Sequence, residues 1–148
     1  MNITFDFSPN FSKKKRKTKD IKFVILHYTG MQSEIAGKSK WKKFIDLNRC
    51  SIGIELVNRG HKFGYQDYSK NQINSLLKLC KDLKKKYSIK KENFLGHSDI
   101  APLRKIDPGE KFPWKKLSKY KIGKWFDNGL KIPKIETKKK RSIFFRNL

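Results

Sequence analysis

A run of consecutive apolar residues, KFVILHY from Lys22 to Tyr28, limits the possible folds more than any other part of the sequence. A short apolar run without alternating polar residues is typical of a fully buried strand. His27 lies at the C-terminal end of this expected strand, and Gly30 allows a turn after it. We therefore expect a buried strand that ends in a histidine.

Two further elements follow from the periodicity of apolar residues. The segment SIGIELV, residues 51–57, alternates between apolar and less apolar positions, which predicts a strand with Glu55 on its less apolar face. Between Ser69 and Ser88, apolar residues recur at helical spacing, and Ser69 is a suitable N-cap. The sequence thus predicts a helix over this range whose role is packing.

The stretch GHSDIAPLRKIDPG, from Gly96 to Gly109, contains one of the three histidines of the chain. Phe94 and Leu95 predict a short strand that delivers His97 to its position. We expect an ordered loop over residues 102–113, because prolines recur in it, and a short helix that begins near Trp114.

His27, His97 and Asp107 are candidate metal ligands. Zinc binds histidine nitrogen and carboxylate oxygen, and a catalytic zinc uses three protein ligands and leaves the fourth position to water. In an extended segment Lys105 and Asp107 would project to the same side, which would place a cation where an oxyanion develops. From spacing alone, however, ordinary hydrogen bonding of such side chains is the more common outcome.

The formal net charge of +24 predicts attraction to polyanions without choosing among nucleic acid, anionic lipid and carboxylate-rich polymers. Lysine dominates in a chain also rich in Ile, Asn and Phe, a composition that an A+T-rich coding sequence produces without selection for binding. A basic nucleic-acid-binding module is therefore a hypothesis that charge alone suggests. The basic runs at 13–19 and 138–141 are of a kind that usually forms solvated tails.

Cys50 and Cys80 have no metal-ligand spacing and are too few for a disulfide scaffold, so we expect free thiols. The first residues do not have the pattern of a signal peptide, and no segment is apolar enough to span a membrane. We expect a cytoplasmic location, with the cell envelope as the alternative.

Five segments together resemble one enzyme family: HYTGM (27–31), AGKSKW (36–41), LNRCSIGIELVNRGH (47–61), GHSDIAPLRKIDPGEKFPW (96–114) and KIGKWF (121–126). They are similar to the type-2 N-acetylmuramoyl-L-alanine amidases, zinc enzymes whose superfamily includes the peptidoglycan recognition proteins. The resemblance implies an α/β fold with a mixed central β-sheet flanked by helices. It further implies an amidase-like domain at 21–130, between a basic leader at 1–20 and a basic tail at 131–148.

The resemblance also implies an activity, which is hydrolysis of the amide between N-acetylmuramic acid and L-alanine in peptidoglycan or muropeptides. Carried over position by position, His27, His97 and Asp107 match the ligands of Zn²⁺, Glu55 matches the catalytic glutamate and Lys105 the catalytic lysine. We expect a monomer with a peptidoglycan or muropeptide substrate, no specific nucleic-acid partner and no membrane span.

Other polar and aromatic residues near these motifs have structural interpretations. We expect His61 to be a structural or substrate-contacting residue rather than a ligand. Asp99 is expected to cap a loop, because Asp side chains readily bond to nearby backbone groups. The tryptophans are expected to pack in the core or at the rim: Trp41, Trp114 and Trp125.

The sequence departs from the family pattern in one place, where several dozen residues are missing between Ser33 and Ala36. In the family this segment supplies central sheet strands and one wall of the cleft. We therefore expect a curtailed sheet, in which the ligand-bearing strands could pair directly, and a short surface connection over 31–38. An inactive pseudo-amidase or deleted remnant that at most binds cell-wall fragments is the alternative to an active enzyme.

Overall fold

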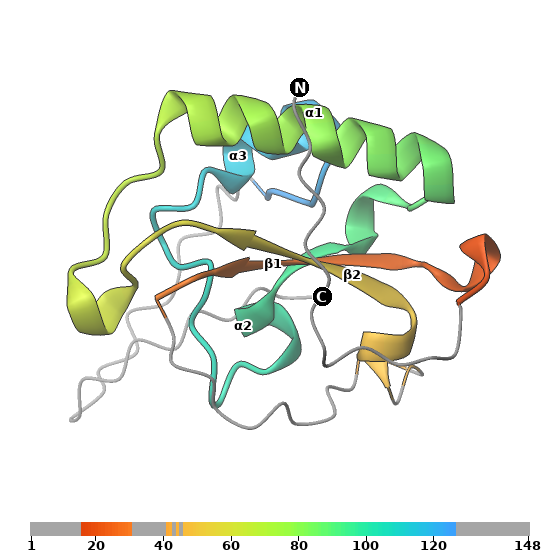
Figure 1. Cartoon of the computed structure of the whole chain (residues 1–148), viewed down its shortest axis with the longest axis horizontal. Coiled ribbons are helices and arrows are strands. Elements are labelled where there is room, and N and C mark those ends of the chain that lie inside the picture. The colour runs from red at the N-terminus through yellow and green to blue at the C-terminus, as the bar shows by residue number, and fades with distance from the viewer. Residues whose placement is uncertain (1–15, 31–40, 43, 45, 127–148) are drawn as a thin grey trace.

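The computed structural model describes residues 16–30, 41, 42, 44 and 46–126. Three strands form a single sheet in the order β2-β1-β3: β1 (Phe23–Tyr28), β2 (Ser51–Leu56) and β3 (Phe94–Gly96). Both pairings are parallel, and Figure 1 shows the labelled strands β1 and β2 running in the same direction. The α/β class that the sequence predicts is confirmed, and the pairings between the named strands are parallel rather than mixed.

The central strand β1 is the apolar run that the sequence analysis identified. It pairs with β2 over six positions, from Phe23 opposite Ser51 to Tyr28 opposite Leu56, and with β3 over three. Five of its six residues are buried, and His27 is the exception. Continuous apolarity follows from this position, because a central strand in a parallel sheet is covered on both faces.

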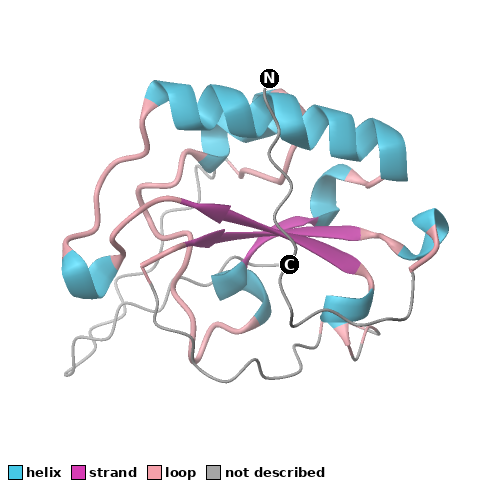
Figure 2. Cartoon of the chain, in the orientation of Figure 1, coloured by secondary structure: helices cyan, strands magenta, loops and turns pink. Residues whose placement is uncertain are grey.

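Each face of the sheet packs against its own apolar cluster, because side chains of a strand alternate between the two faces. On one face, Val24 and Leu26 pack with residues of α1 (Lys70–Tyr87) and α3 (Trp114–Lys119). On the other, Phe23 and Ile25 pack with residues that include Leu47 of the 3₁₀ turn η2 (Leu47–Arg49) and Ile100 of α2 (His97–Ile100). Figure 2 shows the sheet between these two layers.

Helix α1 begins and ends where the sequence predicts. The Ser69 side chain accepts a hydrogen bond from the backbone N–H of Gln72, and the Gln72 side chain accepts one from Ser69 N–H. Ser88 ends the helix in the left-handed conformation, with φ of 52°. An N-cap of this type stabilises a helix by about 1 kcal/mol, and the apolar stripe of α1 packs it against the sheet.

The remaining described segments are short. Three further 3₁₀ turns occur: η1 (Thr18–Asp20), η3 (His61–Phe63) and η4 (Lys91–Asn93). Residues 101–113 contain turns but no helix or strand, which agrees with the predicted ordered loop. Within the described ranges, no helix has both the length and the apolar composition that crossing a bilayer requires.

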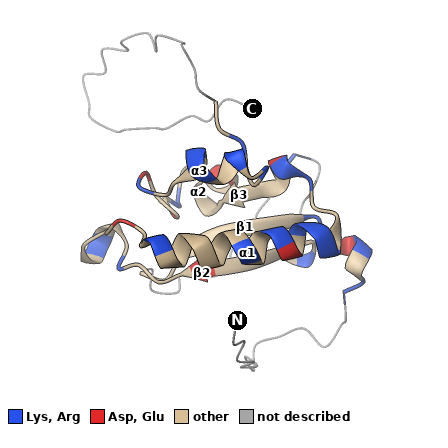
Figure 3. Cartoon of the chain, turned by 90° about the horizontal axis from the view of Figure 1, so that it is seen from above, with Lys and Arg blue, Asp and Glu red and all other residues tan. Residues whose placement is uncertain are grey.

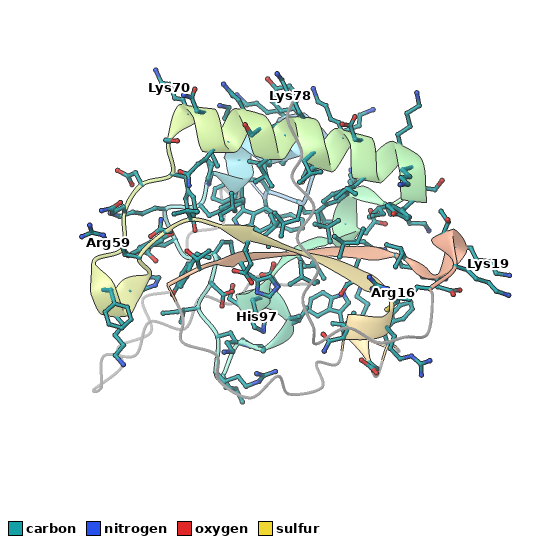
Figure 4. The ribbon with its side chains drawn as sticks, in the orientation of Figure 1. Arg16, Lys19, Arg59, Lys70, Lys78 and His97 are labelled. Atoms are coloured by element: carbon teal, nitrogen blue, oxygen red, sulfur yellow. The ribbon has the colours of Figure 1, made fainter. Side chains whose placement is uncertain are left out.

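Basic side chains cover the outward side of the helical layer. Figure 3 shows Lys and Arg along α1 and on α3, and Lys70 and Lys78 point away from the sheet in Figure 4. Most lysines of α1 are exposed. The basic side chains of α1 therefore lie mostly on the surface.

Several predictions concern parts of the chain that the structure does not describe. The expected surface connection at 31–38 lies outside the described residues, as do most of the basic leader and the basic tail. The missing segment between Ser33 and Ala36 and the domain limits 21–130 stay predictions. The strands that carry the candidate ligands pair directly, because β1 is hydrogen-bonded to both β2 and β3.

Candidate active site

The three candidate ligands come together at one end of the sheet. His27 is the fifth residue of β1, and His97 directly follows β3, so both lie near the carboxyl ends of neighbouring parallel strands. Ligand sites of open α/β sheets form at this edge. Asp107 comes from the loop after α2, and Figure 4 shows His97 beneath the sheet at α2.

Strand alternation explains why the two histidines face each other. Ile25 and Leu95 are register partners on the face of the sheet that α2 covers. His27 and His97 each lie two residues further along, so the period of two places them on this same face. Their rings lie edge to face, with centroids 4.5 Å apart.

The ligand atoms approach one another closely. His27 Nδ1 lies 3.0 Å from His97 Nδ1 and 3.1 Å from Asp107 Oδ2, and His97 Nδ1 lies 3.2 Å from the same oxygen. Among the described residues this is the one group of three or more such side chains arranged to hold a metal. The spacing is close to the separation of roughly 3.3 Å between ligands of a tetrahedral zinc with bonds of about 2.0–2.1 Å.

The protonation chemistry of these atoms also fits a cation. A carboxylate only accepts hydrogen bonds, and each Nδ1 carries at most one proton, so at most two of the three short contacts can be hydrogen bonds at once. In addition, Asp107 Oδ1 is buried and has no hydrogen-bond partner among the described residues. A single bound cation would interact favourably with all of these atoms, so the donor set fits zinc.

Asp107 is fully buried and carries the negative charge of the group. Burial alone raises the pKa of its carboxyl, but the hydrogen bonds and charges of His27 and His97 outweigh this effect and lower that pKa to about 2. The carboxylate is therefore ionised at neutral pH, the state in which it binds a metal.

Glu55 lies beside the group on the neighbouring strand. It is the register partner of His27, so the two side chains stand on the same face of adjacent strands. Glu55 is an exposed residue. Partial burial of its carboxyl still raises the pKa, and His27 opposes this rise while Asp107 adds to it. Glu55 is thus near the group but outside the set of candidate ligands.

Lys105 is buried to 6% exposure, whereas the next residue, Ile106, is 52% exposed and Asp107 is buried again. Burial thus alternates along these three residues, and the projection of Lys105 and Asp107 to the same side stays a prediction. The backbone N–H of Lys105 donates to the carbonyl of Ala101 at 2.9 Å. Lysines are rarely buried to this extent unless their ammonium group has a partner.

The other polar residues have structural positions. His61 lies outside the candidate metal group, with Nδ1 3.0 Å from the Tyr28 hydroxyl and Nε2 2.8 Å from a Glu110 carboxylate oxygen. Because the Glu110 carboxylate can only accept, Nε2 is the donor in that contact. The predicted capping role of Asp99 is confirmed, since its carboxylate accepts from Gly96 N–H at 2.8 Å.

The tryptophans differ in burial. Trp114 is buried at 4% exposure and belongs to the main core, whereas Trp125 is 46% exposed. Trp41 is partly buried against the second apolar cluster. The expected packing is confirmed for Trp114, in the core, and for Trp41, at the margin of the second cluster, whereas Trp125 belongs to neither apolar cluster.

Two tyrosines that no sequence pattern predicts lie against the loop of Asp107. Tyr65 and Tyr68 both donate a hydrogen bond to the carbonyl of Pro108, the residue after Asp107. The two tyrosines are three residues apart in an irregular segment, where no helical or strand period marks them. No pattern predicts a role for Gly53 either; a Cβ at this position would lie 3.7 Å from His27 Nε2.

Comparison with known proteins gives consistent similarities. Residues 36–110 match the family model described as N-acetylmuramoyl-L-alanine amidase. The chain is 45% identical over 97 residues to the N-acetylmuramoyl-L-alanine amidase AmiD of Escherichia coli. The aligned segment covers 62% of this chain and 35% of AmiD. It therefore spans about a third of the length of this relative.

Solved structures of two proteins share the fold. AmpDh3 from Pseudomonas aeruginosa is 30% identical in sequence, and its crystal structure superposes with a TM-score of 0.67. The superposition covers 86% of this chain and 69% of AmpDh3. The structure of AmpDh3 in complex with anhydromuramic pentapeptide gives a TM-score of 0.66. AmiD from E. coli was solved in complex with the substrate anhydro-N-acetylmuramic acid-L-Ala-D-gamma-Glu-L-Lys. It is 29% identical in sequence with a TM-score of 0.62, and the superposition covers 79% of this chain and 63% of AmiD.

Proposed function

Because the chain belongs to the N-acetylmuramoyl-L-alanine amidase family, we propose that it is a zinc-dependent amidase. It hydrolyses the amide between the lactyl group of N-acetylmuramic acid and L-alanine of the stem peptide, in peptidoglycan or muropeptides. The observation that carries the proposal is the approach of His27 Nδ1, His97 Nδ1 and Asp107 Oδ2 to within 3.0–3.2 Å of one another.

His27, His97 and Asp107 would hold the metal. When bound, zinc supplies Lewis acidity that lowers the pKa of water towards about 7 and polarises a carbonyl. The two histidines offer neutral nitrogen ligands from strand ends, and the ionised Asp107 offsets part of the charge of the ion. Since His27 and His97 are only partly buried, the group stays open on the side where a substrate would approach.

Glu55 would act as the general base. Its carboxylate takes a proton from the attacking water as the new C–O bond forms, and later gives that proton to the alanine nitrogen as the C–N bond breaks. A raised pKa suits this exchange, because a carboxyl that is too acidic accepts protons poorly. Lys105 would stabilise the oxyanion that develops on the carbonyl oxygen.

The two structural relatives were solved with anhydromuropeptides bound. We therefore favour a soluble anhydro-muropeptide as a substrate, with intact peptidoglycan as a second possibility for the same chemistry. The alternative of an inactive protein that only binds wall fragments makes the opposite prediction for turnover. Nucleic-acid binding is supported by charge alone and by no arrangement of the described residues.

The test combines metal content with turnover. The purified protein, prepared without chelator, should contain one zinc by elemental mass spectrometry and release peptide from anhydro-muropeptide in a chromatographic assay. His97→Ala should lose both. His61→Ala is the matched control, because it removes the histidine that lies outside the group, and it should keep the zinc. Wild-type protein without zinc, or unchanged zinc in His97→Ala, would contradict the proposal; zinc without turnover would favour the binding-only alternative.

A further inference from the structure

We propose that Tyr65 and Tyr68 are positioning residues for Asp107, and that their hydroxyls act as a redundant pair on one backbone carbonyl. Both hydroxyls donate to the carbonyl oxygen of Pro108, each at 2.8 Å. The inference concerns the same site and rests on the proposed function, because it assigns these tyrosines a role in presenting a metal ligand.

Anchoring the Pro108 carbonyl restrains Asp107 because the chain between them has little freedom. The peptide bond is planar, and the proline ring fixes φ of Pro108. The atoms from the Asp107 carbonyl to the Pro108 carbonyl therefore move almost as one body. Rotation about ψ of Pro108 is the main freedom that remains. A displacement of the Pro108 carbonyl is transmitted to the backbone that carries the Asp107 side chain.

The same short segment is held from its other end by the start of α2. The backbone N–H of Ser98 donates to the Asp107 carbonyl at 2.8 Å. A Cβ on Gly96 would come within 2.7 Å of Pro108 Cδ, so the proline ring packs directly against the strand end that leads to His97. Asp107 thus lies between the β3–α2 junction and the two tyrosine hydroxyls.

Two donors on one acceptor make the restraint redundant. A carbonyl oxygen has two lone pairs and can accept both hydrogen bonds. Pro108 is buried, so a carbonyl that keeps one donor stays satisfied, whereas one that loses both bears the larger cost of a buried unsatisfied acceptor. Burial raises the pKa of the Tyr65 hydroxyl to about 12 and also raises that of Tyr68, so both remain protonated donors at neutral pH.

Neighbouring residues fix the two phenol rings. The Tyr65 ring stacks on His61 with centroids 4.2 Å apart, and the Tyr68 ring meets Phe112 edge to face at 5.3 Å. Gly109 has φ of 85°, and a Cβ there would lie 2.6 Å from Tyr65 Cζ. Glycine at this position therefore leaves the space that the Tyr65 ring occupies.

The experiment is a double-mutant cycle on the full chain: wild type, Tyr65→Phe, Tyr68→Phe and the double variant. Phenylalanine keeps the ring and removes only the hydroxyl. Zinc affinity is measured by chelator competition, and the urea midpoint of unfolding by circular dichroism. The amide signal of Ser98 in a ¹⁵N–¹H spectrum reports directly on the Asp107 carbonyl, with or without zinc.

Each single variant should keep zinc affinity within about twofold, whereas the double variant should lose roughly 10- to 100-fold, the range found when support of a metal ligand is removed. The urea midpoint of the double variant should fall by more than the sum of the single shifts, and the Ser98 signal should move only there. Tyr120→Phe, at a 46% exposed position, is the control and should leave all three readouts unchanged.

The outcomes separate this inference from the proposed function. Additive effects, or an unshifted Ser98 signal in the double variant, would overturn the redundant pair. If wild-type protein binds no zinc, the proposed cofactor is wrong, and the urea cycle and the Ser98 signal still decide whether the tyrosines position Asp107. A double variant that fails to fold while both single variants keep the wild-type midpoint would support redundancy; single variants that each lose zinc affinity would contradict it.

Discussion

Glu55→Gln is the change that best separates the proposed chemistry from metal binding. Glutamine has nearly the size of glutamate but cannot take a proton from water at neutral pH. Glu55 is exposed and lies outside the set of candidate ligands, although it is the register partner of His27. The substitution therefore removes the proposed base and leaves the three candidate ligands in place.

The expected magnitudes follow from this position. Substitution of an exposed residue changes the free energy of unfolding by less than about 0.5 kcal/mol. Loss of a general base lowers the rate about 10²- to 10⁴-fold, which corresponds to about 2.7–5.4 kcal/mol in the activation free energy. Zinc content should stay at the wild-type level. The effect should fall on kcat rather than KM, because proton transfer occurs in the transition state.

The assay follows peptide release from an anhydro-muropeptide by chromatography, with zinc measured on the same preparation. Glu92→Gln, in η4 at the opposite end of the strands, is the matched control and should keep activity within about twofold of wild type. If Glu55→Gln retains wild-type kcat, Glu55 is not the base. If it loses zinc, the division between ligands and base is wrong.

Three further predictions concern the scaffold. Gly30→Ala should destabilise the protein by about 1–3 kcal/mol in urea unfolding, because the new Cβ would overlap the backbone carbonyl of Arg59. Gly53→Ala is the control, because its Cβ would make only ordinary contacts. Equal urea midpoints for the two variants would refute the steric argument. The Cys80 thiol is fully buried, and burial raises its pKa to about 12, so a thiol reagent should modify it only after unfolding; rapid labelling of the native protein would contradict this. Ser69→Ala should cost about 1 kcal/mol in the same urea assay, since it removes the N-cap of α1, and an unchanged midpoint would show that the cap contributes little.

The sequence predicts elements well where burial alone decides them. The run 23–28 becomes a central strand and 70–87 a helix, because the spacing of apolar residues states which faces must be covered. The spacing of apolar residues does not show which strands pair with one another. Val24 pairs with Ile52 on one side and Phe94 on the other, and the apolar pattern of each strand is compatible with other neighbours. Strand order and direction therefore needed the structure.

The candidate site was predicted by resemblance rather than by pattern. His27 and Asp107 are 80 residues apart, so no local rule relates them, and only the long motif around His97 connects the set. The hydrogen bonds of Tyr65 and Tyr68 to the Pro108 carbonyl are not predictable from the sequence for a similar reason. A tyrosine hydroxyl that donates to a carbonyl far away in the sequence produces no periodic pattern of residues.

The order of the strands in the sheet also has a consequence during synthesis. The middle strand β1 is synthesised first, and β3, which pairs with one of its two edges, follows much later. Phe94 of β3 pairs with Val24 of β1 and comes 70 residues after it (94 − 24). At translation rates of about 5–20 residues per second, the ribosome needs roughly 4–14 s to add those residues. During that interval one edge of an unusually apolar strand has no native partner, so nascent chains on neighbouring ribosomes could associate through it. Slower initiation, which spaces ribosomes further apart on the message, should therefore raise the yield of dispersed protein.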